Sequence, residues 1–286
     1  MAEKNNAKRI EDLTFGDEYL FEEVMKNKEL CKLFIETFLE IPDIVDIEYV
    51  GAEESYKSSF WSKGVRFDIY IKGQDGVAYV VELQRADTKE IDKRLRYYQS
   101  KADVKQFPKG RHSTYKDLKD SYIVFIARKD LYGKGRYRYS FQTICKEEPD
   151  LTLDDGAYKI VFNTQGTHGE VSEDVKAFLN AIEGMKTNNP FVQKFEAFAE
   201  EVKADETWRA SYMQTELIIQ DKIDAGIERG IAQGIEQGIE QGANEKAVEM
   251  AKKMLLDDLP LETVSTYTEL PMDELVRIQA RMVHLK

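Results

Sequence analysis

Two acidic residues interrupt an otherwise apolar hairpin pattern, and this feature restricts the fold more than any other in the chain. The segment VRFDIYIKGQDGVAYVVELQ (65–84) holds two alternating apolar runs joined by the turn signal GQDG, which predicts a β-hairpin. Asp68 and Glu82 would then lie opposite each other, where like charges destabilise a sheet. A hard divalent cation between them would remove that penalty, and Gln84 points to the same face as Glu82. An ordinary hairpin with an exposed polar face is the alternative.

The rest of the chain predicts an α/β core followed by helices. In chain order, the expected elements are a helical region over 15–40, a strand at 44–50, the hairpin, a helix from Asp87 or Thr88 to about Gln106, strands at 121–127, 137–145 and 157–164, a helix over 173–184 capped by Ser172, and helices from Asn188 almost to the end. The run at 121–127 is continuously apolar, as in a strand buried on both faces. This order predicts an α/β domain over 1–187 and an α-helical region over 188–286.

Charge is distributed unevenly along the chain, although the formal net charge is −12. Residues 63–139 hold 19 Lys/Arg against 10 Asp/Glu, whereas the remaining residues hold 22 Lys/Arg against 43 Asp/Glu. A basic block within an acidic chain is expected where one face meets a polyanion such as a nucleic acid. Chance clustering on a solvated surface is the alternative.

A glycine repeat marks the C-terminal region. In GIERGIAQGIEQGIEQG (226–242), glycine recurs every four residues and isoleucine follows each of the first four glycines. On a helix, this period keeps the two residue types on adjacent ridges. Each glycine costs roughly 1 kcal/mol relative to alanine, so we expect close packing against another helix and self-association. A flexible linker is the alternative.

The last segment, LPLETVSTYTELPMDELVRIQARMVHL (259–285), predicts two helices joined by a short turn. A helix-turn-helix DNA reader would place Arg277 and Arg281 on its second helix. Residues 254–286 hold six acids against three Lys/Arg, which instead favours a packing or oligomerisation element.

Several classes of protein fit the sequence poorly. The polar N-terminus lacks the apolar stretch of a signal peptide, and no apolar run approaches the roughly 18 residues of a membrane span, so we expect a cytoplasmic protein without membrane contact. Cys31 and Cys145 form neither a disulfide framework nor a metal-binding spacing. His112, His168 and His284 are too scattered for a histidine-based nuclease site, and there is no GxxxxGK[ST] phosphate loop or GxSxG elbow.

Five segments carry a resemblance to a known family. They are LTFGDEYLFEEVM (13–25), RFDIYIKGQDGVAYVVELQ (66–84), KRLRYYQS (93–100), SYIVFIARKDLYGKGRYRYSF (121–141) and the GIEQG repeat. Together they resemble the PD-(D/E)XK nuclease family transposases, which are related to the recombination-promoting nucleases. The resemblance covers nearly the whole chain. It implies a restriction-endonuclease-like core, with a mixed sheet flanked by helices and an α-helical C-terminal tail.

The resemblance also implies a metal site. Asp68 and Glu82 would ligate Mg²⁺ or Mn²⁺, and the backbone carbonyl of Leu83 would complete the protein ligands. Asp17 matches an acidic position of the family and would hold the metal or its water, with Glu36 as the competing candidate. For both Asp17 and Glu36, an ordinary solvated helix acid is the alternative.

The implied function is a metal-dependent endonuclease that hydrolyses phosphodiester bonds of DNA in transposition, recombination or phage defence. Gln84 stands where the superfamily usually has lysine, and Lys93 or Arg94 on the next helix would restore the charge. This replacement keeps an alternative open, in which a catalytically degenerate nuclease fold binds DNA or serves as an oligomeric assembly module. The candidate contacts to DNA phosphates are Arg66, Arg85, Lys89, Lys93, Arg94, Arg96 and Lys101.

Overall fold

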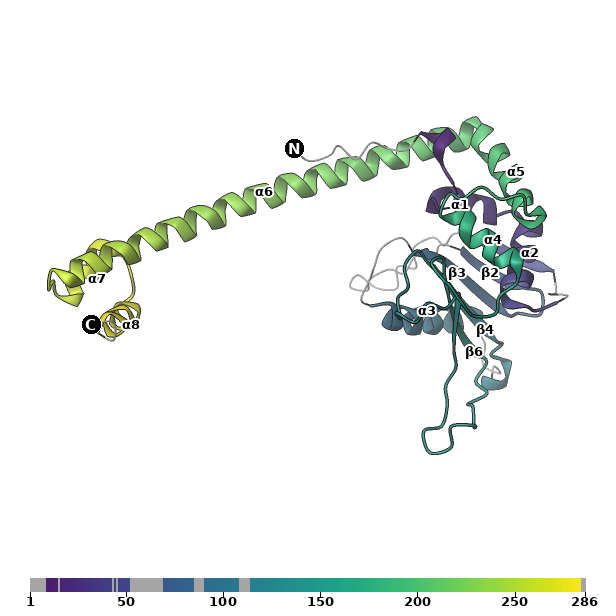
Figure 1. Ribbon diagram of the computed structural model, residues 1–286, viewed down its shortest axis with the longest axis horizontal. Helices are drawn as coiled ribbons and strands as arrows, with labels where there is room; N and C mark the ends of the chain where they lie inside the picture. Colours follow the sequence, from purple (N-terminus) through teal and green to yellow (C-terminus); the bar gives the residue numbers. More distant parts are fainter. Residues whose placement is uncertain are drawn as a thin grey trace. The chain divides into compact units, whose positions relative to one another are not determined.

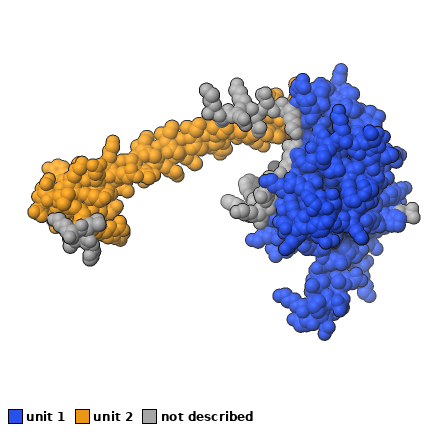
Figure 2. Space-filling model, in the orientation of Figure 1, with its two compact units in different colours: residues 1–212 blue, residues 213–286 orange. Residues whose placement is uncertain are grey.

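The computed structural model of the chain describes residues 9–14, 16–42, 44, 46–51, 69–84, 90–107 and 114–283 (Figure 1). The chain divides into two compact units, Met1–Tyr212 and Met213–Lys286, which Figure 2 colours separately. We call them unit 1 and unit 2. Unit 1 holds every described strand, and the described elements of unit 2 are helices.

Unit 1 follows the predicted order of helices and strands. Its elements are η1 (Ile10–Asp12), α1 (Glu18–Met25), α2 (Lys28–Leu39), β1 (Ile47–Gly51), β2 (Ile69–Gly73), β3 (Ala78–Gln84), α3 (Ile91–Gln106), η2 (Tyr115–Asp117), β4 (Ser121–Ala127), β5 (Arg138–Phe141), β6 (Ala157–Asn163), α4 (Glu173–Ile182), α5 (Pro190–Ala204) and the start of α6 (Glu206–Leu256). Ser172 caps α4 as predicted, because its side chain accepts a hydrogen bond from the N–H of Val175.

The six strands form one mixed sheet in the order β1-β2-β3-β4-β6-β5. The first three are antiparallel, β4 and β6 run parallel to β3, and β5 pairs antiparallel with β6 at the edge. Parallel neighbours need a long crossover, which α3 provides between β3 and β4. The predicted class, an α/β core with a mixed sheet, flanking helices and a helical C-terminal region, is confirmed.

The β2–β3 hairpin keeps the register that the sequence predicts. Ile69 lies opposite Val81, and Lys72 lies opposite Ala78, so five residues separate the last paired positions. Asp68 lies outside the described residues. Within them, the hairpin brings Glu82 to the centre of the sheet, because β3 is flanked by β2 on one side and by β4 on the other.

Helices cover both faces of the sheet and create two separate cores (Figure 1). On one face, α1, α2, α4 and α5 supply a core that includes a cluster of phenylalanine rings, Phe34, Phe38, Phe178 and Phe195. On the other face, α3 is the helix that covers the sheet within the described residues. Its predicted apolar positions, Ile91, Leu95, Tyr98 and Ala102, are all buried there.

The first predicted helical region, 15–40, is two helices rather than one. The break falls at Asn27, whose side chain accepts hydrogen bonds from the N–H groups of Glu29 (3.1 Å) and Leu30 (3.2 Å) and so caps α2. Helix α3 also starts later than predicted, at Ile91, with Glu90 in the N-cap position. Asp87 and Thr88 lie outside the described residues.

The α/β unit continues beyond residue 187, where the sequence places the end of the domain. Helix α5 packs on α1, and the start of α6 adds two aromatic residues to the same core. The Tyr19 ring lies 5.7 Å from Trp208 and 5.6 Å from Tyr212, measured between ring centroids. These contacts explain why the compact unit ends at Tyr212.

Unit 2 consists of the rest of α6 together with α7 (Leu261–Thr268) and α8 (Met272–Val283). Its core gathers Leu255, Val264, Leu275 and Ile278, so α8 has a packing role. The 226–242 repeat lies inside α6 and is therefore helical, and its role in self-association stays a prediction. Among the helices that the structure describes, none has a stretch apolar and long enough for a membrane crossing.

Candidate active site

Glu82 is a carboxylate buried in the middle of the sheet, with only 5% of the residue exposed. Its place on β3, directly beside Phe125 of β4, puts the side chain on the face covered by α3. Two groups of α3 donate hydrogen bonds to the Glu82 Oε1 atom: Nη2 of Arg94, and the hydroxyl of Tyr98 at 2.9 Å. A buried carboxylate therefore has a cationic partner and a neutral donor on the same helix.

Arg94 and Tyr98 reach Glu82 together because residues four apart lie on one face of a helix. Arg94 Nη2 also donates to the Tyr98 hydroxyl at 3.2 Å. The guanidinium lies 5.5 Å from the Tyr98 ring and 5.4 Å from the Phe125 ring, and those rings pack edge to face at 5.3 Å. Burial, and next the negative charge of Glu82, raise the pKa of Tyr98, so its hydroxyl stays protonated as a donor.

We expect Arg94→Ala to lower the free energy of unfolding by about 3 kcal/mol, because removing one partner of a buried pair leaves the other charge in a poor environment. Urea unfolding of the purified variant measures this loss. Arg96→Ala is the matched control, since Arg96 lies exposed on the same helix and should change stability by less than about 0.5 kcal/mol. Equal effects of the two substitutions would mean that the Arg94–Glu82 pair has no stabilising role.

The other predicted phosphate contacts on α3 point elsewhere. Lys93 and Arg96 are exposed, and the Lys101 ammonium lies 5.3 Å from the centre of the Tyr97 ring. Arg94 therefore points toward the sheet, whereas Lys93 and Arg96 lie on the outer surface of α3. Arg66, Arg85 and Lys89 lie outside the described residues. The same holds for the side chain of Gln84, whereas the strand that carries it is described.

Asp17, the predicted additional acid, caps a helix. It is buried, and its side chain accepts hydrogen bonds from the N–H groups of Tyr19 (3.2 Å) and Leu20 (3.4 Å) at the start of α1. Glu36, the competing candidate, accepts a hydrogen bond from the N–H of Ile44 at 3.1 Å. Both carboxylates thus have structural partners, and a metal-binding role for either stays a prediction.

Substitutions at Asp17 can separate the capping role from the metal role. Asparagine caps helices about as well as aspartate, so we expect Asp17→Asn to keep the stability of the protein. Asp17→Ala removes the cap and should lower the free energy of unfolding by about 1 kcal/mol. Thermal unfolding measures both. Loss of metal-dependent cleavage in a fully stable Asp17→Asn protein would assign the metal role to Asp17.

The donor chemistry at Glu82 fits a hard divalent cation. Mg²⁺ is commonly held by one or two carboxylates, with waters and phosphate oxygens completing the shell. Glu82 supplies one such carboxylate, and the Leu83 carbonyl follows it on the same strand. Among the described residues there is no group of three His, Cys, Asp or Glu side chains that could hold a metal ion. The second predicted ligand, Asp68, is not among those residues.

The sequence did not reveal that Tyr98 donates to Glu82. The spacing of Arg94 and Tyr98 on a predicted helix directly after β3 was the available signal, but it does not tell which strand residue the pair meets. The pairing follows from how α3 lies across β3 and β4, because Phe125 of β4 orients the Tyr98 ring.

Comparison with known proteins gives one match. The family model described as PD-(D/E)XK nuclease family transposase matches residues 9–161, a range that includes the hairpin, α3 and β4. Searches of curated proteins and of solved structures gave no match.

Proposed function

From the premise that the chain belongs to the PD-(D/E)XK nuclease family transposases, we propose that it is a metal-dependent DNA endonuclease acting in transposition, recombination or phage defence. Membership of this family supports a function related to nucleases and transposition. The buried Glu82 carboxylate, held by Arg94 and Tyr98 on the central strand, is the observation that carries the proposal.

Glu82, Asp68 and the Leu83 carbonyl would hold Mg²⁺ or Mn²⁺. When bound, such a cation would supply activation of a water and stabilisation of negative charge on the phosphate. Glu82 contributes a fixed oxygen, because its side chain is oriented by the Tyr98 hydroxyl at 2.9 Å. The aromatic rings of Tyr98 and Phe125 keep bulk water away from this carboxylate and so strengthen its attraction for cations.

Arg94 supplies the positive charge that Gln84 cannot. Its guanidinium is planar with several donors, so it can hold the Glu82 carboxylate and a phosphate oxygen at the same time. Its side chain is 27% exposed, so the group is accessible from solvent as well as from Glu82. Arg94 would thereby orient the phosphodiester beside the carboxylate.

Plasmid nicking tests the proposal directly. The purified protein should convert supercoiled DNA to nicked or linear forms in Mg²⁺ or Mn²⁺, and EDTA should stop the reaction. Absence of nicking by a folded protein in either metal would instead support the degenerate fold that binds DNA or assembles with itself. The Gln84 replacement favours that second function, since it removes the usual lysine from the site.

The protein would act as a homo-oligomer through α6. Its repeat exposes four isoleucines, Ile227, Ile231, Ile235 and Ile239, which are 50%, 58%, 58% and 69% exposed. Each repeat glycine from Gly226 to Gly242 faces open space. Apart from the neighbouring helix backbone, the described chain has no atom within 4 Å of a Cβ added at any of them. A second copy of α6 is the partner that fits this regular apolar stripe.

A further inference from the structure

Strand β5 is an open edge of the sheet. Within the described residues it pairs with β6 alone, so one side of the strand has no neighbouring strand. A hydrogen bond from the Asn163 N–H to the Tyr137 carbonyl, at 2.9 Å, fixes which backbone groups face β6. Hydrogen-bonded and non-hydrogen-bonded pairs alternate in an antiparallel ladder. The N–H and C=O groups of Arg138 and Ser140 therefore point away from β6, to the open edge.

The open edge continues beyond β5. Ile144 forms an antiparallel bridge with Thr152, and the N–H of Cys145 donates to the Leu151 carbonyl at 2.9 Å. This pattern makes Ile144 a non-hydrogen-bonded position, so its backbone groups point to the same edge as those of Ser140. We call residues 138–144 the β5 edge. At the rise of a strand, this segment is about 20 Å long.

The β5 edge lacks the usual protection of sheet edges. Such edges are commonly blunted by proline, by charged side chains or by short length, because their unpaired backbone groups accept another strand. Residues 139–144, YSFQTI, include neither a charged residue nor a proline, and residues 140–144 are all exposed. Four of the six residue types, Tyr, Phe, Thr and Ile, favour strands. The segment is therefore suited to pairing with a further strand.

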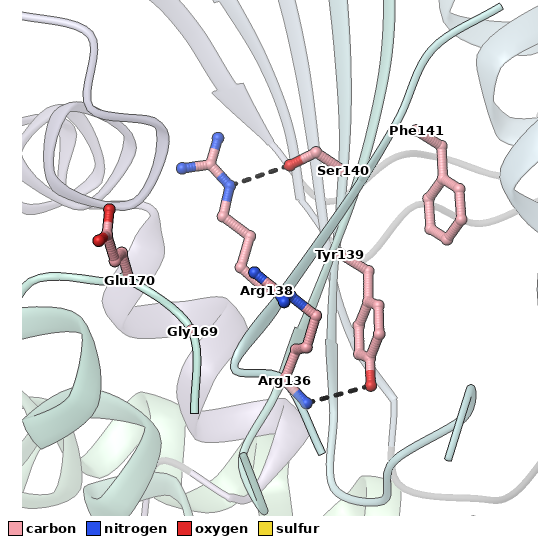
Figure 3. A pocket seen from close by; sticks show the side chains of 7 residues that line it. All are labelled: Arg136, Arg138, Tyr139, Ser140, Phe141, Gly169 and Glu170. Atoms are coloured by element: carbon pink, nitrogen blue, oxygen red, sulfur yellow. Dashed lines mark hydrogen bonds between the residues drawn. The ribbon is translucent and has the colours of Figure 1, made fainter. Parts of the chain in front are cut away.

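One face of β5 is basic. Figure 3 shows Arg136, Arg138 and Ser140 on one side of the strand, facing the segment that carries Gly169 and Glu170. These five residues belong to the lining of a cavity of about 680 Å³, which is large enough for a side chain of a bound molecule. Glu170 is exposed and adds one negative charge to this lining.

The two arginines of this face differ in their partners. Arg138 donates from Nη1 to Glu40 Oε2 at 3.0 Å and from Nε to the Ser140 hydroxyl at 3.1 Å, so its charge is already paired. Within the described residues the Arg136 guanidinium has no hydrogen-bond or ion-pair partner. A Cβ added at Gly169 would lie 3.6–3.8 Å from it, so the glycine leaves space there. An acidic side chain entering this cavity would thus pair with Arg136.

The opposite face of β5 is aromatic. Tyr139 and Phe141 lie on the other side of the strand from Arg138 (Figure 3). Phe141 is 39% exposed, and its ring lies 5.1 Å from that of Tyr132, which in turn lies 4.8 Å from Tyr139. This group of packed rings offers apolar surface to a side chain that arrives on the same face.

A strand added to the β5 edge would meet both faces at once, because successive side chains of a strand point to opposite faces. We propose that the β5 edge binds an extended peptide segment of a partner protein as an added strand, with acidic side chains toward Arg136 and apolar side chains toward Phe141. Main-chain hydrogen bonds supply the affinity in this mode of binding, and the alternating side chains supply the specificity. This role goes beyond the proposed nuclease function and does not depend on it.

The test is fluorescence anisotropy of a short labelled peptide, in which glutamate and valine alternate, with the full-length protein. Ser140→Pro should weaken binding about tenfold or more, because proline removes the outward N–H and its ring occupies the edge. Proline is tolerated where an edge N–H faces solvent, so the fold should survive, and thermal unfolding checks this. Ser140→Ala is the matched control. Both variants lose the hydroxyl that accepts from Arg138, but alanine keeps the N–H, so its affinity should stay close to wild type.

Arg136→Glu tests the preference for acidic side chains. It should weaken binding of the glutamate peptide about tenfold, as for a lost hydrogen bond to a charged group, and strengthen binding of a peptide with lysine in place of glutamate. Lys134→Glu makes the same charge change at an exposed residue outside the cavity lining. Its effect should stay below about twofold at physiological salt.

A peptide of the same composition, with its glutamates and valines in separate blocks, shows whether alternation matters. It should bind more weakly than the alternating peptide. Equal affinity for the two peptides would overturn the proposal, because charge alone would then explain binding. The proposal would also fail if wild type bound neither peptide, or if Ser140→Pro and Ser140→Ala bound equally well. A smaller oligomer of Ser140→Pro than of wild type in light scattering would replace the partner peptide by a second copy of the chain.

Discussion

Glu82→Gln should reduce metal-dependent DNA cleavage by about a thousandfold or more, because the proposed metal site would lose its buried anionic ligand. The amide has nearly the same shape as the carboxylate, and its oxygen can still accept from the Tyr98 hydroxyl. The fold should therefore survive. Plasmid nicking measures cleavage, and thermal unfolding measures the stability of the same preparation. Asp68→Asn should give the same loss of activity, since Asp68 is the second proposed ligand.

A matched control must break a comparable ion pair elsewhere. Glu183 pairs with Arg128 at 2.8 Å and is 23% exposed, and this partner lowers the pKa of Glu183. Glu183→Gln thus removes a partly buried carboxylate from an arginine without touching Glu82, and cleavage should continue. Equal nicking by wild type and Glu82→Gln would contradict the catalytic assignment. Loss of cleavage in Glu183→Gln as well would point to stability rather than to chemistry.

Local patterns were sufficient for the elements that position Glu82. The alternation of 65–84 with its GQDG turn fixes the hairpin register, and the described pairs from Ile69 to Lys72 follow it. The continuous apolar run of β4 predicts a strand inside the sheet, and the structure places it between β3 and β6. Both signals depend on neighbours in the chain, which is why they are readable from sequence.

The side-chain partners of the site could not be read in this way. Arg94 has a long side chain that could meet solvent, phosphate or a carboxylate, and its choice depends on how α3 lies over the sheet. The cavity lined by Arg136, Arg138 and Gly169 beside β5 is harder still to predict from sequence, because Arg136 and Gly169 come together through the intervening strand β6. Non-local packing of this kind leaves no periodic signal.

Asp17 shows how one residue type admits two interpretations. Family resemblance marks it as a metal-site acid, whereas its N-cap geometry accounts for its burial through two backbone N–H groups. Aspartate is favoured in both settings because each needs a negatively charged oxygen. The sequence therefore predicts an important carboxylate at this position without telling which need it serves.

The α6 repeat should make the protein an oligomer, most simply a dimer, and replacing Gly230, Gly234 and Gly238 by leucine should abolish the assembly. The substitution favours helix by roughly 0.8 kcal/mol per site, so any loss of association cannot come from a weaker helix. Leucine would fill the notches that let two backbones approach, while the isoleucines beside them would stay exposed in a monomer. Light scattering on wild type and triple variant measures the change.

Two further chains make the result specific. Replacing Ala232, Glu236 and Glu240 by leucine adds the same side chains to another face of α6, about 150° around the helix from the centre of the glycine–isoleucine stripe. This control should therefore remain an oligomer. A chain ending at Tyr212 keeps unit 1 and lacks the repeat, so it should be a monomer. A monomeric wild type would refute the idea. An oligomer that persists in the shortened chain would move the interface into unit 1, where two candidate active sites would be brought together by the α/β unit itself.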